Sequence, residues 1–290
     1  IGQGTETVFS QIVADAVGLG LESVNVVQPD TSVVPDSGPT VASRTVMIVG
    51  GVLARAGAGL RDELRSFISE RTGHPMEQVG LKEGRFQTSG GVELGSFASV
   101  GDAYLEEKGP LRVEEGYMPL GDDAFDEKTY RGIAYPAYGW GCDVVEIEMD
   151  PDTLIIRPQK MTTVCDVGKV INPVLCRGQV EGGTLQAVAY GYLEEIKLEE
   201  CRFLNDRLTT YIIPTTLDTP EFDCVLIENP APGGPFGAKG VGELPMDGGA
   251  PAVVQAIENA SGICSHSIPA TPERLLSCRK EGSEVKPMNG

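Results

Sequence analysis

The chain has 290 residues, of which 41% are hydrophobic, and a formal net charge of −19 at pH 7. This content is enough for one large domain or two modest ones, each with a hydrophobic core. The strong negative charge would repel nucleic acid, and no basic cluster with interleaved aromatics is present, so nucleic-acid binding is excluded.

The sequence also argues against a membrane protein and against the common metal centres. No apolar stretch approaches the length needed to cross a bilayer, and no secretory signal opens the chain, so we expect no membrane association and a cytoplasmic location. None of the seven cysteines lies two to four residues from another, which excludes the usual zinc and iron–sulfur spacings and suits half-buried thiols in a reducing compartment. The two histidines, His74 and His266, lie in unrelated contexts, so we predict no metal-ligating residue.

The first 72 residues predict two helices. Apolar residues recur at helical spacing over residues 8–17, with Thr5 as a possible capping residue at the start and Gly18 or Gly20 at the end. Residues 21–30 predict a short strand, and a long helix is expected from near Ala42.

The middle of the chain mixes strands and helices. Residues 72–130 predict short strands and loops. Two alternating apolar–polar runs flank the turn at residues 150–153, which predicts a β-hairpin. Residues 171–195 predict a helix interrupted by glycines, and residues 207–215 and 221–230 predict strands.

A glycine-rich loop, GGPFGAKGVGELP, follows at residues 233–245. It is not a Walker phosphate-binding loop, because Ala238 precedes Lys239 and Gly240 follows it. Val253, Ile257 and Ala260 then share one helical face, and the chain from Ser277 is a polar, loose tail. Strands and helices without regular alternation predict an α+β fold.

Seven stretches, in this order, resemble one family: Gly2-Gln3-Gly4, SGPTVAS (37–43), YGWGCDVVEIEMD (138–150), DVGKVINP (166–173), GQVEGG (178–183), YIIPT (211–215) and GAKGVGELP (237–245). The family is the molybdenum hydroxylases, which include xanthine dehydrogenases, aldehyde oxidoreductases, nicotinate dehydrogenase and carbon monoxide dehydrogenase. The match is to the C-terminal half of their molybdopterin-binding subunit. The resemblance implies two mixed α/β lobes that form the second molybdopterin-binding domain of the xanthine oxidase-like fold, over residues 1–276, with a tail at 277–290.

The resemblance implies a role for the glutamate that ends the glycine-rich loop. Glu243 matches the family's general base, which takes a proton from a metal-bound hydroxide while an oxygen derived from water is inserted at an electron-poor carbon. Desolvation in a tight apolar loop would raise the pKa of this carboxylate toward the operating pH. The alternative is that Glu243 has no catalytic role and simply lies in the first turn of a helix, where acidic residues are favoured.

Further residues match cofactor-binding positions of the family. Gln3 matches a glutamine that hydrogen-bonds the pterin, for which an amide offers both a donor and an acceptor, or it is an ordinary turn residue. Ser43 and Thr45 match hydroxyl positions that face the cofactor, or they cap a helix. Gln179 matches a glutamine near the cofactor, or it is a solvated helix residue. Lys239 matches a cofactor position, or it is a flexible surface lysine.

The predicted cofactor-binding set is therefore Gly2, Gln3, Gly4, Ala42, Ser43, Thr45, Gln179, Lys239, Gly240, Val241 and Gly242. Asp166 and Asn172 are predicted to order the turn before a helix. Arg44 stands where a small residue was expected, and it either reaches a phosphate or lies on the surface.

The resemblance implies cofactors and partners beyond this chain. The cofactor is molybdopterin with molybdenum, as a mononucleotide or a dinucleotide, and the other half of the molybdopterin-binding subunit must complete its site. Iron–sulfur clusters and FAD are expected on an iron–sulfur subunit and a flavin subunit, and the substrate is a small molecule, an N-heteroaromatic ring or an aldehyde. We expect this chain to be inactive without its partner half.

Two other functions remain open from the sequence. One is a non-catalytic structural or binding homologue that lacks the cofactor, against which the intact Gly240–Glu243 motif and Gln3 speak. The other is a nucleotide-binding module at Gly2–Gly4, which lacks a complete GxGxxG motif and a preceding strand.

Overall fold

The computed structural model describes residues 1–117, 125–126 and 128–284, and the chain forms two compact units. The first unit contains Ile1–Tyr138 and Pro230–Gly240, and the second contains Gly139–Asn229 and Val241–Gly290. The chain therefore passes from one unit to the other after residues 138, 229 and 240.

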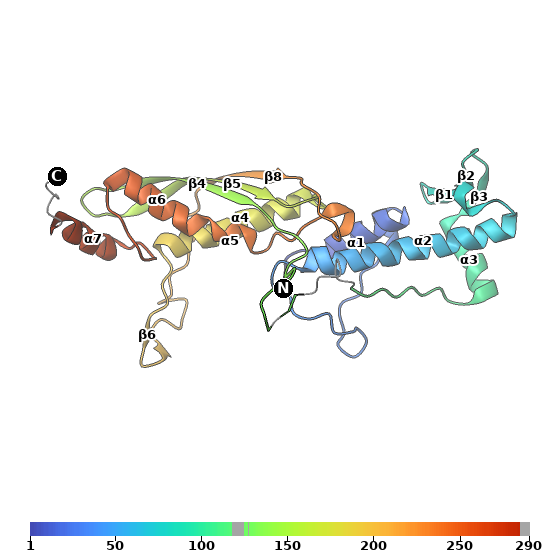
Figure 1. The fold of residues 1–290 in the computed structure, drawn as a ribbon, viewed down its shortest axis with the longest axis horizontal. Coiled ribbons are helices and arrows are strands. Elements are labelled where there is room, and N and C mark those ends of the chain that lie inside the picture. Colours follow the sequence, from blue (N-terminus) through green and yellow to red (C-terminus); the bar gives the residue numbers. More distant parts are fainter. Residues whose placement is uncertain (118–124, 127, 285–290) are drawn as a thin grey trace. The chain divides into compact units, whose positions relative to one another are not determined.

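Two packed helices form one part of the first unit (Figure 1). Helix α1 (Thr5–Val17) ends at Gly18, whose φ of 92° is the left-handed conformation that terminates helices. A π-helical turn η2 (Thr45–Val49) leads into α2 (Gly50–Thr72), so the helix expected from Ala42 begins at Thr45. The two helices approach closely because Gly57 faces Ala16: a Cβ at Gly57 would lie 3.1 Å from that of Ala16.

The other part of the first unit is a small sheet with a helix beside it. Strands β1 (Val79–Lys82), β2 (Arg85–Thr88) and β3 (Glu93–Ser96) pair antiparallel in that order, and α3 (Phe97–Lys108) follows. Their core joins Phe67 of α2 to Tyr104 of α3, with ring centroids 5.2 Å apart in an edge-to-face pair. Short 3-10 turns occur at η1 (Leu21–Ser23), η3 (Met76–Gln78) and η4 (Pro235–Gly237).

The second unit is a three-stranded sheet with helices on one face (Figure 1). Strands β4 (Gly141–Met149) and β5 (Ile156–Asp166) form the predicted antiparallel hairpin, and β8 (Glu221–Ile227) pairs parallel to β5. The helices are α4 (Pro173–Tyr192), α5 (Leu244–Asp247), α6 (Gly249–Ser261) and α7 (Pro272–Glu284). Met161, Val188, Val253, Ile257 and Leu275 are buried between the layers.

A two-stranded hairpin, β6 (Leu198–Glu199) and β7 (Arg202–Phe203), lies between α4 and β8 in the sequence. The strands predicted over 207–215 and 21–30 are wrong, because both segments contain only turns and irregular backbone. Helix α3 was not predicted, and α4 runs unbroken through its glycines.

The predicted tail differs from the structure. The backbone of residues 277–284 is helical, within α7, rather than loose, and residues 285–290 lie outside the described residues. The α+β fold is confirmed, with both helices and sheets in each unit.

Candidate functional site

The residues at the start of α1 present polar groups that the described residues do not satisfy. Gly4 is the N-cap of α1, with a φ of 83° and no capping side chain, so the expected cap at Thr5 is wrong. The backbone N–H groups of the first turn are thus available to an acceptor. The Oε1 atom of Gln3 is buried and has no hydrogen-bond partner among the described residues. A buried acceptor of this kind costs free energy unless a ligand or water meets it.

The residues before α2 are in strained backbone conformations. Ala42 and Ser43 have φ values of 52° and 51°, a region that residues with a Cβ adopt rarely and at an energetic cost. Neither Ser43 nor Thr45 is the N-cap: Arg44 takes that position without a side-chain capping bond, and its Nη1 atom donates to the Pro39 carbonyl at 3.0 Å.

The glycine-rich loop packs against this strained turn within the first unit. A Cβ at Gly240 would lie only 1.6 Å from the Ser43 carbonyl oxygen, so no other residue fits there without moving the backbone. Lys239 is only 8% exposed, which rules out the alternative of a flexible surface lysine. The structure thus brings the predicted pairs Ala42–Ser43 and Lys239–Gly240 together.

The rest of the loop, Val241, Gly242 and Glu243, belongs to the second unit. Glu243 is the N-cap residue of α5 and its side chain is exposed, so the expected burial in an apolar loop is wrong for this chain. The carboxylate lies at the surface because the two residues that follow it, Leu244 and Pro245, turn their apolar side chains inward instead.

The residues after Glu243 are held tightly. Cβ atoms at Gly139 and Gly141 would each lie 3.2 Å from the Leu244 side chain, and one at Gly183 would lie 2.9 Å from Pro245. Leu244 therefore rests on the start of β4 and Pro245 on α4. These contacts fix the backbone from which Glu243 projects.

The remaining predicted residues lie on or before α4. Asn172 caps α4 by accepting a hydrogen bond from the Leu175 N–H at 3.0 Å, and Asp166 accepts one from the Gly168 N–H at 3.2 Å, so both order the turn as predicted. Gln179 is half-buried on α4, next to the buried Val180.

One polar group near α5 was missed by the sequence analysis. Asp143 of β4 lies under Gly248, where a Cβ would be 1.9 Å from its Oδ2 atom, and its Oδ1 atom is buried without a partner among the described residues. Burial, and to a smaller extent the negative charge of Asp247, raise the pKa of Asp143, although a hydrogen bond from Thr163 opposes the shift. The alternation of β4 could have found it, because Asp143 shares the inward face with Val145 and Ile147.

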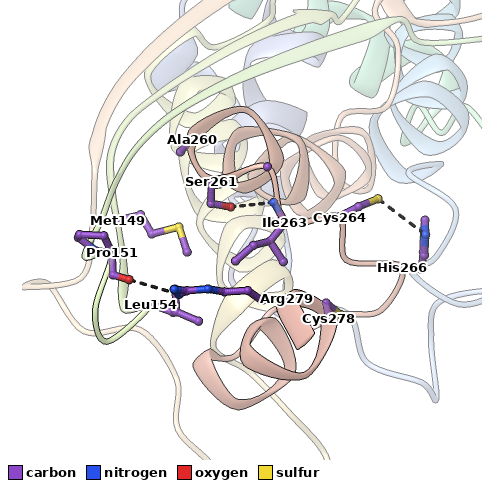
Figure 2. A pocket seen from close by; sticks show the side chains of 11 residues that line it. Met149, Pro151, Leu154, Ala260, Ser261, Ile263, Cys264, His266, Cys278 and Arg279 are labelled. Atoms are coloured by element: carbon purple, nitrogen blue, oxygen red, sulfur yellow. Dashed lines mark hydrogen bonds between the residues drawn. The ribbon is translucent and has the colours of Figure 1, made fainter. Parts of the chain in front are cut away.

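A cavity of about 790 Å³ lies elsewhere in the second unit, between the β4–β5 turn, the end of α6 and α7 (Figure 2). It is lined by residues that include Met149, Leu154, Ile263 and Cys278, and by none of the predicted site residues. Cys264 and His266 lie beside each other there, with Sγ and Nε2 3.7 Å apart. No three His, Cys, Asp or Glu side chains in the described part of the chain are placed to hold a metal ion.

Residues 1–220 match the family model of the molybdopterin cofactor-binding domain. The chain belongs to this molybdopterin-binding family. It is 31% identical over 284 residues to the gamma subunit of the 6-hydroxypseudooxynicotine dehydrogenase complex of Paenarthrobacter nicotinovorans, covering 96% of this chain and 34% of that subunit. It is 29% identical to a probable xanthine dehydrogenase subunit from Bacillus subtilis, covering 95% of this chain and 36% of the relative.

The crystal structure of quinoline 2-oxidoreductase from Pseudomonas putida 86 aligns with a TM-score of 0.80 and 27% identity, over 97% of this chain and 35% of that one. The chain is also 28% identical to a putative xanthine dehydrogenase molybdenum-binding subunit of Escherichia coli, covering 95% of this chain and 36% of that relative. It spans about a third of the length of the curated relatives it matches.

None of the helices in the described residues combines the length and apolarity needed to cross a bilayer. The candidate site residues of the chain are divided between the units. The first unit holds Gly2–Gly4, Ala42, Ser43, Thr45, Lys239 and Gly240, and the second holds Gln179 and Val241–Glu243.

Proposed function

We propose that this chain binds part of a molybdopterin cofactor and supplies Glu243 as the general base of a hydroxylation reaction. The reaction would insert an oxygen derived from water at an electron-poor carbon of a small substrate. When bound, the cofactor supplies the two-electron oxidation. The observation that carries the proposal is the exposed carboxylate of Glu243, at the N-cap of α5, on a backbone held by the contacts of Leu244 and Pro245.

The residues of the first unit fit a pterin. The buried Oε1 atom of Gln3 needs a donor, and the ring and amino N–H groups of a pterin are donors. The uncapped first turn of α1 offers N–H groups to an anionic or carbonyl oxygen, such as a phosphate of the cofactor. Gly2 suits a close approach, because a Cβ there would meet nothing within 4 Å, and Gly4 has a φ of 83° that favours glycine.

The strained turn at Ala42 and Ser43 supports the same role. Strain of this kind persists where the surroundings hold it in place, and it gathers at ligand sites. Gly240 lies against the Ser43 carbonyl and supplies that support. We propose that Ser43 and Thr45 face the cofactor. The loop residues Lys239, Gly240, Val241 and Gly242 would also contact it, with Gln179 as a further contact.

In the proposed reaction Glu243 accepts a proton from the water-derived hydroxyl as that oxygen adds to the substrate carbon. The Glu243 side chain is exposed in this chain, and the remaining part of the molybdenum-binding subunit would exclude water from it. An N-heteroaromatic ring is the favoured substrate, since xanthine and quinoline, which occur in the names of relatives, are such rings. We keep an aldehyde as the alternative substrate.

We propose that the electrons leave through other chains, an iron–sulfur subunit and a flavin subunit, in a cytoplasmic assembly. The cysteines of this chain lack the spacings that bind iron–sulfur clusters. One relative is a subunit of a dehydrogenase complex, which is consistent with such an assembly.

Replacing Glu243 with Gln in the assembled enzyme tests the proposal. We expect unchanged molybdenum content, by elemental analysis, and a turnover lowered by about 10²–10⁴-fold, which is the usual contribution of a general acid or base. The control is Glu77→Gln, another exposed glutamate, which should leave turnover unchanged.

Turnover of Glu243→Gln near the wild-type value would refute the role of the base. Absence of molybdenum from the wild-type assembly, with every partner present, would favour a non-catalytic homologue instead.

A further inference from the structure

An arm that carries many exposed apolar residues leaves the second unit after α4. We define the arm as residues 195–217, which include β6 and β7, and Figure 1 shows it extending away from the sheet. Its base is fixed by polar bonds: Asn205 donates to the Glu195 carbonyl at 2.6 Å and accepts from the Lys197 N–H at 2.9 Å. The Tyr211 hydroxyl donates to the Glu194 carboxylate at 2.7 Å, and Arg274 of α7 bonds to Glu195. The arm is therefore a built feature of the fold.

The arm points apolar side chains into solvent. Leu198 and Phe203 lie directly opposite each other on β6 and β7, and Phe203 is 59% exposed. Leu208 is 80% exposed. The exposed apolar side chains of the arm are Ile196, Leu198, Phe203, Leu204, Leu208, Ile212, Ile213 and Leu217. Scattered exposed apolar residues are normal, but so many in one short segment are typical of an interaction surface.

The outer face of α4 adds a second, independent feature. The sheet side of this helix is buried at residues such as Val180, Thr184 and Ala187. On the opposite side, the residues at intervals of four are Val174, Gly178, Gly182, Gln186 and Tyr190, and all are exposed. A Cβ at Gly178 or Gly182 would meet nothing within 4 Å, so the chain itself does not require glycine at either position. Glycine inside a helix is destabilising relative to alanine, and small residues let another backbone approach closely.

We propose that the arm and the outer face of α4 together form the docking surface for the part of the molybdenum-binding polypeptide that the relatives carry beyond the region matched by this chain. This inference rests on the proposed function, because it names where the partner half binds. About two-thirds of the relatives' length lies outside the match, so a large polypeptide is available to cover the surface.

The chemistry of the surface favours this occupant over others. The exposed leucines, isoleucines and Phe203 of the arm are of the kind that permanent interfaces bury, and charged residues such as Glu199 and Arg202 lie among them. A second copy of this chain would bring the same net charge of −19 and be repelled. A covalent neighbour, or a permanently bound fragment of the same subunit, would bury these apolar side chains permanently.

The test is to produce this chain with the polypeptide of the same organism that corresponds to the rest of the relatives' molybdenum-binding subunit. Association is measured by light scattering after gel filtration and by titration calorimetry. We expect Leu198→Asp with Phe203→Asp to raise the Kd by at least about 100-fold, because central apolar residues dominate such interfaces. Gly182→Leu should raise it at least about tenfold by filling the open face of α4.

Two controls match these changes. Gly101 lies in α3, and a Cβ there would meet nothing within 4 Å, as at Gly182. Val92 is an exposed apolar residue of the first unit. Gly101→Leu and Val92→Asp should therefore leave the Kd within about twofold of the wild-type value. Thermal unfolding checks that Gly182→Leu leaves the isolated chain at least as stable, since leucine favours helices more than glycine.

The inference fails if the wild-type chain does not associate, if the arm and α4 variants associate as tightly as wild type, or if the variants instead abolish self-association of this chain. A tight wild-type complex without molybdenum would leave the docking surface standing and refute the proposed function. The two failures are therefore distinguishable.

Discussion

Asp143 shows how a single carboxylate can depend on a glycine far along the chain. Its Oδ2 atom touches Gly248, between α5 and α6, and its Oδ1 atom has no partner among the described residues. Because burial and Asp247 raise its pKa, the folded protein holds the proton of Asp143 more tightly than the unfolded chain does. The ionised form therefore opposes folding.

The sign of the pH dependence follows. With a folded pKa above the unfolded one, the stability that comes from Asp143 is fully present below the unfolded pKa and falls as pH rises through the folded pKa. We predict that Asp143→Asn removes this loss, so the free energy of unfolding of the variant relative to wild type increases as pH rises through that window. Urea unfolding at a series of pH values measures it.

Asp150 is a control of opposite sign. Hydrogen bonds from the Thr153 and Asp152 N–H groups lower its pKa, so its charge stabilises the fold above the unfolded pKa and that gain disappears as pH falls. Asp150→Asn should thus become less stable relative to wild type as pH rises. If the free energies of unfolding of the two variants, relative to wild type, changed with pH in the same direction, the raised pKa of Asp143 would be contradicted.

At the scale of the element, α4 links the sheet, α5 and the arm. Its start is defined by Asn172, whose side chain accepts the Leu175 N–H, and by Pro173 in the first turn. We predict that Asn172→Ala lowers the free energy of unfolding by about 1 kcal/mol, measured by urea unfolding. Asn259→Ala, on the exposed last turn of α6, should change it by less than about 0.5 kcal/mol. Equal losses in the two variants would show that the cap contributes nothing special.

Elements with strong local signals could be predicted from the sequence. The β4–β5 hairpin follows from alternation on both sides of a turn that Asp150 stabilises, and α6 follows from its apolar face at Val253 and Ile257. The strand expected at 207–215 was wrong because Ile212 and Ile213 form an apolar run without a neighbouring strand, and both are exposed. Helix α3 has only Val100 and Tyr104 buried, too few for a clear period.

In the candidate site too, local features could be predicted from the sequence and contacts between distant segments could not. Local geometry of Asn172 and Asp166 could be predicted because turn and cap chemistry is local. The close packing of Gly240 on Ser43, and of Gly248 on Asp143, could not, because each joins segments distant in the sequence. The exposure of Glu243 is likewise a result of how the residues that follow it pack.

On the scale of the whole molecule, the thiols are distributed unevenly: all seven cysteines lie in the second unit. Burial raises the pKa of Cys165 to about 12 and that of Cys176 to about 11, whereas Cys142 and Cys201 are exposed. We predict that an alkylating reagent at about pH 8 labels Cys142 and Cys201 at least about 100-fold faster than Cys165, since the thiolate is the reactive form. Peptide mass spectrometry over time measures this.

The unfolded chain in guanidinium is the control, in which all seven thiols should react at similar rates. Rapid labelling of Cys165 in the folded chain would mean that the second unit opens readily. Protection of Cys165 reports on the second unit alone, because the first contains no cysteine.

The passage of the chain between its units bears on how the protein is synthesised. Residues 230–240 belong to the first unit, where Pro235 packs against Gly50 and the Gly233 carbonyl against Gly51. A ribosome that has released the chain as far as residue 138 has therefore not yet released everything that the first unit needs. Until Gly240 emerges from the exit tunnel, Pro235 and Gly233 cannot pack against Gly50 and Gly51 of α2. The first unit therefore completes its folding only after most of the second unit has been synthesised.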